Sequence, residues 1–336
     1  SKFITKNTLI IIETTLPPGT CDKIIYPILL SETKKRGFLR KEIMLSYSYE
    51  RIMPGYDYYD SIVNNYRVFS GVDSRSKNKC QKFLEKIINV KKYALYLLNS
   101  NTECEFSKIL ENSYRATNIA FIDEWTKYSR IAKVDMYNVL GAIKKRHTHS
   151  NIMRPGLGVG GYCLTKDPLF AKIAARDILY LKGHEFPFST EALKVNADMP
   201  LVTLNKLENY FDNDLNGKKF LLMGVTYRQD VGDTRFSPSE IFVKQARSKG
   251  VEISAYDPLI DYWDEVDIDM KKYLPNPFAF DAIIFAVPHK VFADISINEW
   301  IKQKSILVFD ANNVLTKKQV SEIKENKLNY MSIGRG

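Results

Sequence analysis

The sequence predicts an α/β protein with two doubly wound domains joined by a long central helix. Three observations lead to this prediction. A β-branched run at residues 8–12 precedes a stretch in which apolar residues recur at helical spacing, which is the order of a β-α unit. A long segment after residue 104 keeps helical periodicity with almost no glycine or proline. Strand-like and helix-like runs then alternate again from about residue 215, so a second parallel sheet covered by helices is expected.

The first part of the chain alternates short strands with helices. The continuous run at residues 8–12 is typical of a strand buried on both faces of a parallel sheet. A Pro17-Pro18-Gly19 turn follows it. We expect helices at residues 20–30 and 76–88, and further strands at 43–47, 66–70 and 93–98. No glycine-rich phosphate-binding turn precedes residue 8, so this domain is expected to be incomplete at its N-terminus.

The middle of the chain predicts one long helix over residues 104–145, and another helix follows at 201–212. Apolar side chains in the long helix are spaced by three and four: Phe106, Ile109, Leu110, Tyr114, Thr117, Phe121 and Trp125. An apolar face this broad suits a domain connector or a dimer interface. The last part predicts a helix at 238–249 and strands at 219–225, 251–256, 281–287 and 305–310.

Composition narrows the class of protein. A chain of 336 residues with 45% hydrophobic and 26% charged residues is expected to fold into two or more domains. The net charge of +10 is spread along the chain, which argues against nucleic-acid binding. Four cysteines show no spacing typical of a metal site, and no apolar run reaches the roughly 18 residues of a membrane span. We therefore expect a cytoplasmic protein without a structural metal.

Glycines gather before Cys163. The spacing Gly156-x-Gly158-x-x-Gly161 matches a dinucleotide fingerprint, but it follows Met153-Arg154-Pro155 rather than a strand, so we do not predict a pyrophosphate loop. Glycines let the backbone approach a ligand closely, and Lys166 and Asp167 lie within one helical turn of the thiol. Cys163 is therefore a candidate nucleophile, whereas the other three cysteines are expected to be inert and buried.

Lys108 and Asn112 are a second candidate pair. They are four residues apart in the predicted long helix, so both project from one face and can converge on a single small group. The alternative interpretation is a solvated helical face.

Five segments carry motifs: E-T-T-L-P-P-G-T at residues 13–20, E-R-I-M-P-G at 50–55, K-x-x-x-N-x-x-R at 108–115, G-V-G-G-Y-C-L-T-K-D at 158–167, and G-V-T-Y-R-x-D with D-T-R-x-S-P at 224–238. In this order they resemble the UDP-glucose/GDP-mannose dehydrogenase family of nucleotide-sugar 6-dehydrogenases. The resemblance implies two Rossmann-like domains, NAD as cofactor, a UDP-sugar as substrate and a homodimer. It also implies a division into an NAD-binding part at 1–100, a central helical part at 101–212 and a UDP-sugar-binding part at 213–336.

The resemblance assigns catalytic roles. Cys163 corresponds to the residue that adds to a C6 aldehyde to give a thiohemiacetal and then a thioester. Lys108 and Asn112 correspond to residues that stabilise the oxyanion, because negative charge develops on that oxygen as the thiol adds. Asp167 corresponds to the residue that handles protons and activates water. The implied reaction is a four-electron oxidation of the sugar to the uronic acid.

Further residues are assigned by the same resemblance. Thr15 corresponds to a threonine that holds the catalytic water and Glu50 to a glutamate near the sugar, although Thr15 could instead cap a turn and Glu50 could pair with Arg51. The residues expected to bind NAD are Thr15, Glu50, Lys166 and Arg235.

Substrate-binding residues follow from the last two motifs: Tyr227, Arg228, Gly160 and Tyr162. Arg228 stands where the family has a lysine, which keeps the charge and alters the geometry. Asn312 replaces an arginine that contacts substrate. The 50–55 motif favours an N-acetylated UDP-hexosamine over UDP-glucose, whereas Tyr162 and Lys166 favour the opposite choice.

Two alternatives remain at this point. Another two-domain NAD dehydrogenase, such as a 6-phosphogluconate dehydrogenase relative, shares the architecture but needs no cysteine. A truncated, catalytically silent dimeric paralogue or scaffold is the second, because the expected glycine-rich NAD segment is missing from the chain.

Overall fold

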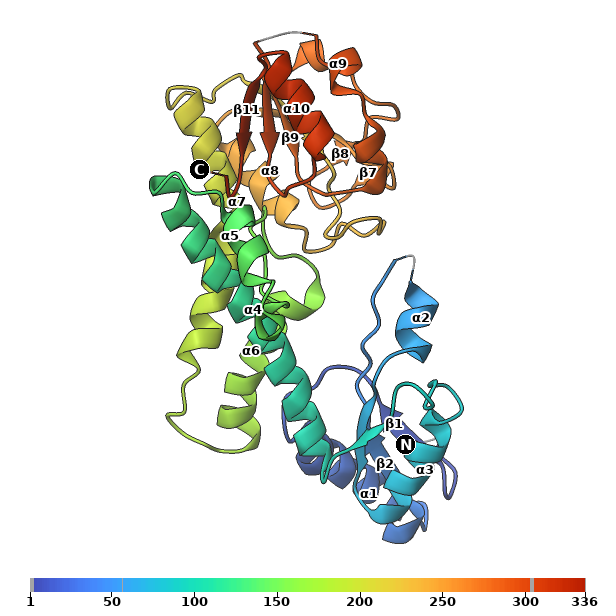
Figure 1. Cartoon of the computed structure of the whole chain (residues 1–336). Helices are drawn as coiled ribbons and strands as arrows, with labels where there is room; N and C mark the ends of the chain where they lie inside the picture. Colours follow the sequence, from blue (N-terminus) through green and yellow to red (C-terminus); the bar gives the residue numbers. More distant parts are fainter. Residues whose placement is uncertain (1–2, 56, 303–304, 336) are drawn as a thin grey trace. The chain divides into compact units, whose positions relative to one another are not determined.

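The computed structural model describes residues 3–55, 57–302 and 305–335, and the chain forms two compact units (Figure 1). The first unit comprises Ser1–Tyr114 and Lys166–Thr190, and the second comprises Arg115–Thr165 and Glu191–Gly336. Three helices have residues in both units: α4 (Asn101–Ile131), α6 (Tyr162–Ile173) and α7 (Pro187–Tyr210).

The first unit contains a mixed sheet of order β1-β2-β3-β4, with strands β1 (Leu9–Ile12), β2 (Met44–Tyr47), β3 (Val68–Gly71) and β4 (Tyr96–Leu97). Strands β1 and β2 pair in parallel, with Leu9 opposite Met44, whereas β2 and β3 are antiparallel. The prediction that the first strand is buried on both faces was wrong. It lies at the edge of the described sheet, so its residues are only half-buried, whereas β2 is fully buried.

Helices cover this sheet and enclose three of the four cysteines. Helix α3 packs against β1, β2 and β3, and Cys21, Cys80 and Cys104 are buried in the two apolar clusters of the unit. These three thiols behave as the expected buried hydrophobes. The helical segments are the π-helical η1 (Cys21–Ile25), α1 (Tyr26–Lys34), η2 (Arg40–Glu42), α2 (Tyr58–Val63), α3 (Ser74–Leu84) and the π-helical η4 (Ala174–Ile178).

The predicted helix over residues 104–145 is two helices. Helix α4 ends at Ile131, and Lys133 then adopts a left-handed conformation with a φ of 55°. Asp135 begins α5 (Met136–Ile143), because its carboxylate accepts hydrogen bonds from the backbone N–H groups of Tyr137 at 2.8 Å and Asn138 at 3.1 Å. A left-handed residue followed by a side-chain cap is enough to interrupt apolar periodicity that continues through both helices.

The second unit contains a five-stranded parallel sheet of order β11-β10-β9-β5-β6. Its strands are β5 (Lys219–Met223), β6 (Glu252–Tyr256), β9 (Ala282–Phe285), β10 (Leu307–Asp310) and β11 (Asn329–Ser332). Four of them confirm predicted strands. Strand β11 and the small hairpin of β7 (Tyr262–Trp263) and β8 (Ile268–Asp269) were not predicted, because they are short and mix polar with apolar residues.

Helices flank both faces of this sheet. Phe220 and Leu222 of β5 pack in one cluster with Phe242, whereas Leu221 and Met223 pack in another with Ile323. Alternate side chains of one strand therefore meet different helices, which is the doubly wound arrangement that was predicted. The remaining helical segments are η3 (His147–His149), α8 (Pro238–Ser248), η5 (Pro277–Ala279), η6 (Lys290–Asp294), α9 (Ile297–Trp300) and α10 (Lys317–Glu325).

Candidate functional site

One face of α4 carries three buried polar side chains in the first unit. Glu105, Lys108 and Asn112 have exposed fractions of 0%, 8% and 2%. Their spacing of three and then four residues places them on the same helical face. A solvated helical face is therefore excluded for Lys108 and Asn112. Buried polar groups need partners, and each of these three finds its partner on a different segment of the unit.

Lys108 contacts the segment that follows β2. Its Nζ donates a hydrogen bond of 3.2 Å to the backbone carbonyl of Glu50 and lies 5.3 Å from the centre of the Tyr49 ring. The predicted alternative for Glu50, a surface pair with Arg51, is not found, because Arg51 pairs with Glu111 at 3.1 Å. Lys108 therefore connects the central helix to the E-R-I-M-P-G motif.

Asn112 holds the carboxylate of Asp167, which has no exposed surface. Its Nδ2 donates to Asp167 Oδ2 at 2.8 Å, and Lys166 Nζ contacts Asp167 Oδ1 at 2.9 Å. A buried carboxylate whose two oxygens have separate donors is fixed in orientation. Three predicted site residues, Asn112, Lys166 and Asp167, are thus brought together within the first unit.

Glu105 fixes the turn that follows the Thr15 segment. Its carboxylate accepts hydrogen bonds from the backbone N–H groups of Gly19 at 2.6 Å and Cys21 at 2.8 Å. In return, the carboxylate of Asp22 accepts one from the backbone N–H of Thr102 at 3.1 Å, at the start of α4. Two helix starts therefore cap each other. Thr15 itself is half-buried between β1 and this anchored turn.

Burial raises the pKa of Glu105 to about 7, against the opposing effect of the two backbone donors. Glu105 was not among the predicted site residues. Its position three residues before Lys108 was the available signal, but its partners lie more than 80 residues away in the sequence.

In the second unit the glycines before Cys163 are explained by close packing. A side chain at Gly160 would approach the Phe236 carbonyl, Pro238 and Tyr227 to 2.9 Å, and Gly161 has a φ of 81°. The Gly161 N–H donates to the Phe236 carbonyl at 3.2 Å. The glycines therefore seat the start of α6, where Cys163 is exposed, against the segment that carries Tyr227.

Arg235 is held beside Tyr162. Its guanidinium makes two hydrogen bonds to Asp233, at 2.9 and 2.7 Å, and lies 5.2 Å from the centre of the Tyr162 ring. The paired guanidinium lowers the pKa of Asp233. Burial, and then the charge of Asp233, raise the pKa of the Tyr227 phenol. Arg235, a predicted NAD contact, and Tyr162 and Tyr227, two predicted substrate contacts, therefore lie near one another in this unit, on two segments.

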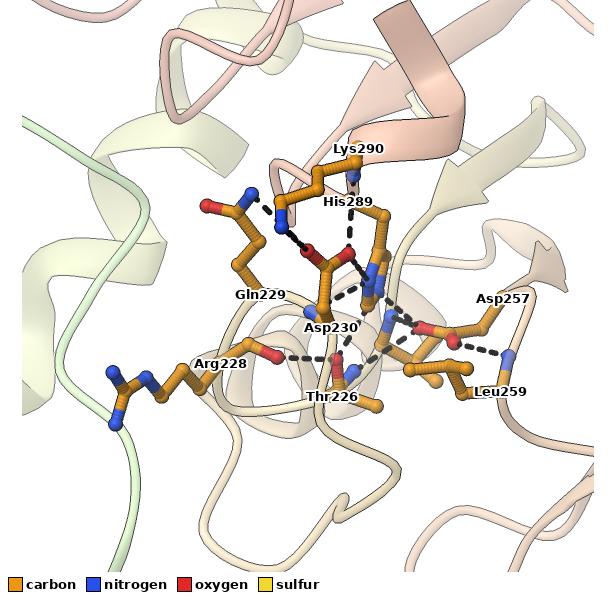
Figure 2. A network of polar contacts seen from close by, with 9 residues as sticks. Thr226, Arg228, Gln229, Asp230, Asp257, Leu259, His289 and Lys290 are labelled. Carbon is orange, nitrogen blue, oxygen red and sulfur yellow. Dashed lines mark hydrogen bonds and ion pairs between the residues drawn. The ribbon is translucent and has the colours of Figure 1, made fainter. Parts of the chain in front are cut away.

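A buried network, which the sequence analysis missed, supports the Tyr227 and Arg228 segment. Figure 2 shows His289 between Asp257 and Asp230, with Thr226 alongside. His289 Nε2 lies 3.0 Å from Asp257 Oδ2, and Asp230 N donates to His289 Nδ1 at 3.0 Å. These residues follow three different strands, so only the folded sheet brings them together.

Within residues 3–55, 57–302 and 305–335, no group of three or more His, Cys, Asp or Glu side chains is placed to hold a metal ion. No helix among those residues is both long and apolar enough to cross a membrane.

Comparison with known proteins matches three models of one family: the UDP-glucose/GDP-mannose dehydrogenase NAD binding domain at residues 1–89, the central domain at 102–198 and the UDP binding domain at 221–317. A UDP-N-acetyl-D-mannosamine dehydrogenase of Methanococcus maripaludis is 30% identical over 318 residues, covering 93% of this chain and 68% of the relative. The chain belongs to the UDP-glucose/GDP-mannose dehydrogenase family. By family it is an NAD-dependent UDP-sugar dehydrogenase, an oxidoreductase, which confirms the predicted enzyme class and NAD as its cofactor.

Other members of the dehydrogenase family are also similar to this chain in sequence and in fold. A UDP-N-acetyl-D-mannosamine dehydrogenase of Methanocaldococcus jannaschii is 32% identical over 255 residues, which is 76% of this chain and 54% of that relative. The chain thus spans about half to two thirds of the length of these two relatives. The solved structure of a UDP-D-ManNAc dehydrogenase from Pyrococcus horikoshii matches with a TM-score of 0.80 and 26% identity, over 100% of this chain and 74% of that one. The predicted α/β class with Rossmann-like units is confirmed.

Proposed function

We propose that the protein oxidises the C6 hydroxyl of a UDP-sugar to the uronic acid in two NAD-dependent steps, through a thioester on Cys163. The observation that carries this proposal is the Asp167 carboxylate, fully buried and bonded to Asn112 and Lys166. This carboxylate is desolvated at the end of the cysteine motif of a dehydrogenase family. Desolvated, oriented carboxylates are typical of proton-transfer sites.

The residues of the first unit fit NAD. Thr15 follows β1 and Glu50 follows β2, and these two strands are parallel and in register from Leu9 to Ile12. Both residues therefore lie at the carboxyl edge of the pair, which is where open α/β sheets bind ligands. Lys166 and Arg235 are the other two proposed NAD contacts. NAD supplies the hydride acceptor for both oxidations.

The proposed chemistry of the chain begins with the C6 hydroxyl, whose proton passes to water and Asp167 as a hydride leaves the carbon. The Cys163 thiolate then adds to the resulting aldehyde, forming a C–S bond and an oxyanion that Lys108 and Asn112 stabilise. Loss of a second hydride from that carbon leaves the thioester. Water activated near Asp167 and Thr15 adds to the thioester, the C–S bond breaks, and the uronate leaves with the thiol restored.

The proposed substrate is an N-acetylated UDP-hexosamine. The motif at residues 50–55 favours this class, and the relatives from two methanogens are UDP-N-acetyl-D-mannosamine dehydrogenases. Tyr227, Arg228, Gly160 and Tyr162 are the proposed substrate contacts. Asn312 donates to the Ala286 carbonyl at 3.0 Å, so its side chain is bonded within the second unit.

The test is NADH production by the purified protein, in the length in which it is naturally made. UDP-N-acetylmannosamine, UDP-N-acetylglucosamine and UDP-glucose are supplied in turn, beside a Cys163→Ala variant and a Cys80→Ala control at a buried thiol. We expect about two NADH per sugar with one N-acetylated substrate, lost in Cys163→Ala and kept in Cys80→Ala. If the folded protein produces no NADH with any of the three sugars, the result would favour a catalytically silent dimeric protein.

We propose that the protein is a homodimer that uses α4. In the second unit this helix exposes Phe121, Trp125, Tyr128 and Ile131 by 51%, 47%, 62% and 75%. Trp125 contacts the rings on either side of it, at 6.2 and 6.0 Å between centres. A continuous aromatic patch of this kind is typical of an interface. Two further expectations stay predictions: the division of the chain into three parts with boundaries after residues 100 and 212, and the cytoplasmic location.

A further inference from the structure

The segment that carries Tyr227 and Arg228 leaves the end of β5 and is held by groups from two other strand ends (Figure 2). Asp257, just after β6, accepts hydrogen bonds from the backbone N–H groups of Val225 at 2.8 Å and Thr226 at 3.4 Å. His289, beyond the end of β9, bonds the same segment farther along. Both Asp257 and His289 have side chains with no exposed surface.

The partners of His289 determine its tautomer. The backbone N–H of Asp230 donates to Nδ1 at 3.0 Å, so Nδ1 carries a lone pair and no proton. The proton of the neutral ring is therefore on Nε2, which lies 3.0 Å from Asp257 Oδ2 and 3.2 Å from the Thr226 hydroxyl oxygen. That hydroxyl in turn donates to the Arg228 carbonyl at 3.0 Å. The imidazole of His289 thus contacts both Thr226 and Asp230, on either side of Tyr227 and Arg228.

The Asp230 end needs such support. Asp230 has a φ of 55°, a left-handed conformation that residues with a side chain adopt at a cost. Its N–H is bonded to His289, and its Oδ1 accepts the backbone N–H of Lys290 at 3.1 Å. Without the Nδ1 acceptor, the Asp230 N–H loses its partner and the backbone loses the contact that fixes this conformation.

We infer that His289 is a positioning residue for UDP-sugar binding, which fixes the Tyr227–Arg228 segment by accepting the Asp230 N–H through Nδ1. The inference rests on the proposed function for the roles of Tyr227 and Arg228. His289 lies outside the five motif segments that carry the family resemblance.

Two substitutions distinguish the roles of the two ring nitrogens of His289. In His289→Asn, the amide oxygen lies near the place of Nδ1 and can accept the Asp230 N–H, whereas the donor to Asp257 is lost. In His289→Gln, the amide nitrogen lies near the place of Nε2 and can donate to Asp257, whereas the acceptor for Asp230 is lost. Each variant loses one buried hydrogen bond, so a purely structural role predicts similar effects from both.

The measurement is the Kd of UDP by titration calorimetry, with the KM of the UDP-sugar and the thermal midpoint of each variant. We expect His289→Gln to weaken UDP binding roughly tenfold, or about 1.4 kcal/mol, and His289→Asn to stay within about threefold of the native protein. Thermal midpoints should fall by similar amounts in the two. His149→Gln, at an exposed histidine, is the matched control. Equal Kd changes in the two His289 variants would overturn the inference.

Amide hydrogen exchange over residues 226–230 tests the positioning without any ligand. The exchange should be faster in His289→Gln than in His289→Asn, and equal rates would contradict the inference. A native protein that fails to bind UDP would refute the proposed function instead, while the exchange experiment would still decide whether His289 fixes the segment.

Discussion

At Asp167 one carboxylate without exposed surface accepts hydrogen bonds from a neutral donor and a charged donor. The two donors fix where each carboxylate oxygen points. Lys166 keeps 46% of its side chain exposed, so one side of the pair remains open to solvent. The geometry therefore suits a group that exchanges protons with water while holding a fixed orientation.

Replacing Asp167 with Asn should lower kcat about a hundredfold, because the amide keeps the shape but cannot accept a proton. The amide nitrogen would also face Asn112 or Lys166, both donors, so the thermal midpoint should fall. Steady-state kinetics and thermal denaturation measure the two effects. Asp177→Asn, at an exposed carboxylate in the same unit, is the control. A kcat within threefold of the native value would argue against a proton-transfer role for Asp167.

At the scale of elements, the start of α4 and the start of the helix at residues 21–34 exchange carboxylate caps through Glu105 and Asp22. The Glu105 carboxyl faces Cys21 and Asp22 on that helix, Cys104 on its own helix and the Tyr47 phenol of β2. Burial raises its pKa from 4.5 to about 7. Between pH 4.5 and about 7, the folded protein therefore keeps a proton on Glu105 that the unfolded chain has already released.

Glu105 should therefore make stability depend on pH in a defined direction. A raised carboxyl pKa contributes stability below about pH 4.5, and this contribution is lost as the pH rises through about 7, by an amount on the order of 3 kcal/mol. Glu105→Gln cannot titrate. Its urea midpoint should lie well below that of the native protein at pH 5 and closer to it at pH 8, with Glu103→Gln, exposed on the same helix, as control. A gap that is unchanged between the two pH values would show that Glu105 does not titrate in this range.

The elements also show which parts of the fold a sequence can predict. The parallel strands of the second unit and the polar spacing of Lys108 and Asn112 follow from local periodicity, which the sequence displays directly. The end of α4 depends on one left-handed residue, Lys133, and one cap, Asp135, within apolar spacing that continues past them. Glu105 and His289 escaped prediction because their partners are distant in the sequence, and a single sequence does not display such pairs.

At the scale of the whole molecule, the aromatic face of α4 bears on assembly. Trp125→Glu should shift the protein toward the monomer, because it would bury a charge in the proposed dimer interface. Sedimentation equilibrium across a range of protein concentrations measures the mass. Tyr273→Glu, at an aromatic residue 75% exposed outside α4, is the control and should leave the mass unchanged. If Trp125→Glu keeps the native mass at every concentration, α4 is not the interface.

Burial divides the cysteines into two groups, with Cys21, Cys80 and Cys104 enclosed and Cys163 exposed. Oxidants and electrophiles reach thiols by diffusion, so the chemical vulnerability of the chain is concentrated at one sulfur. For the proposed enzyme, oxidative stress would remove activity long before it damaged the folded structure. The inactivated molecules would then remain folded. A reductant would restore the activity of those in which Cys163 is oxidised only to a sulfenic acid or a disulfide.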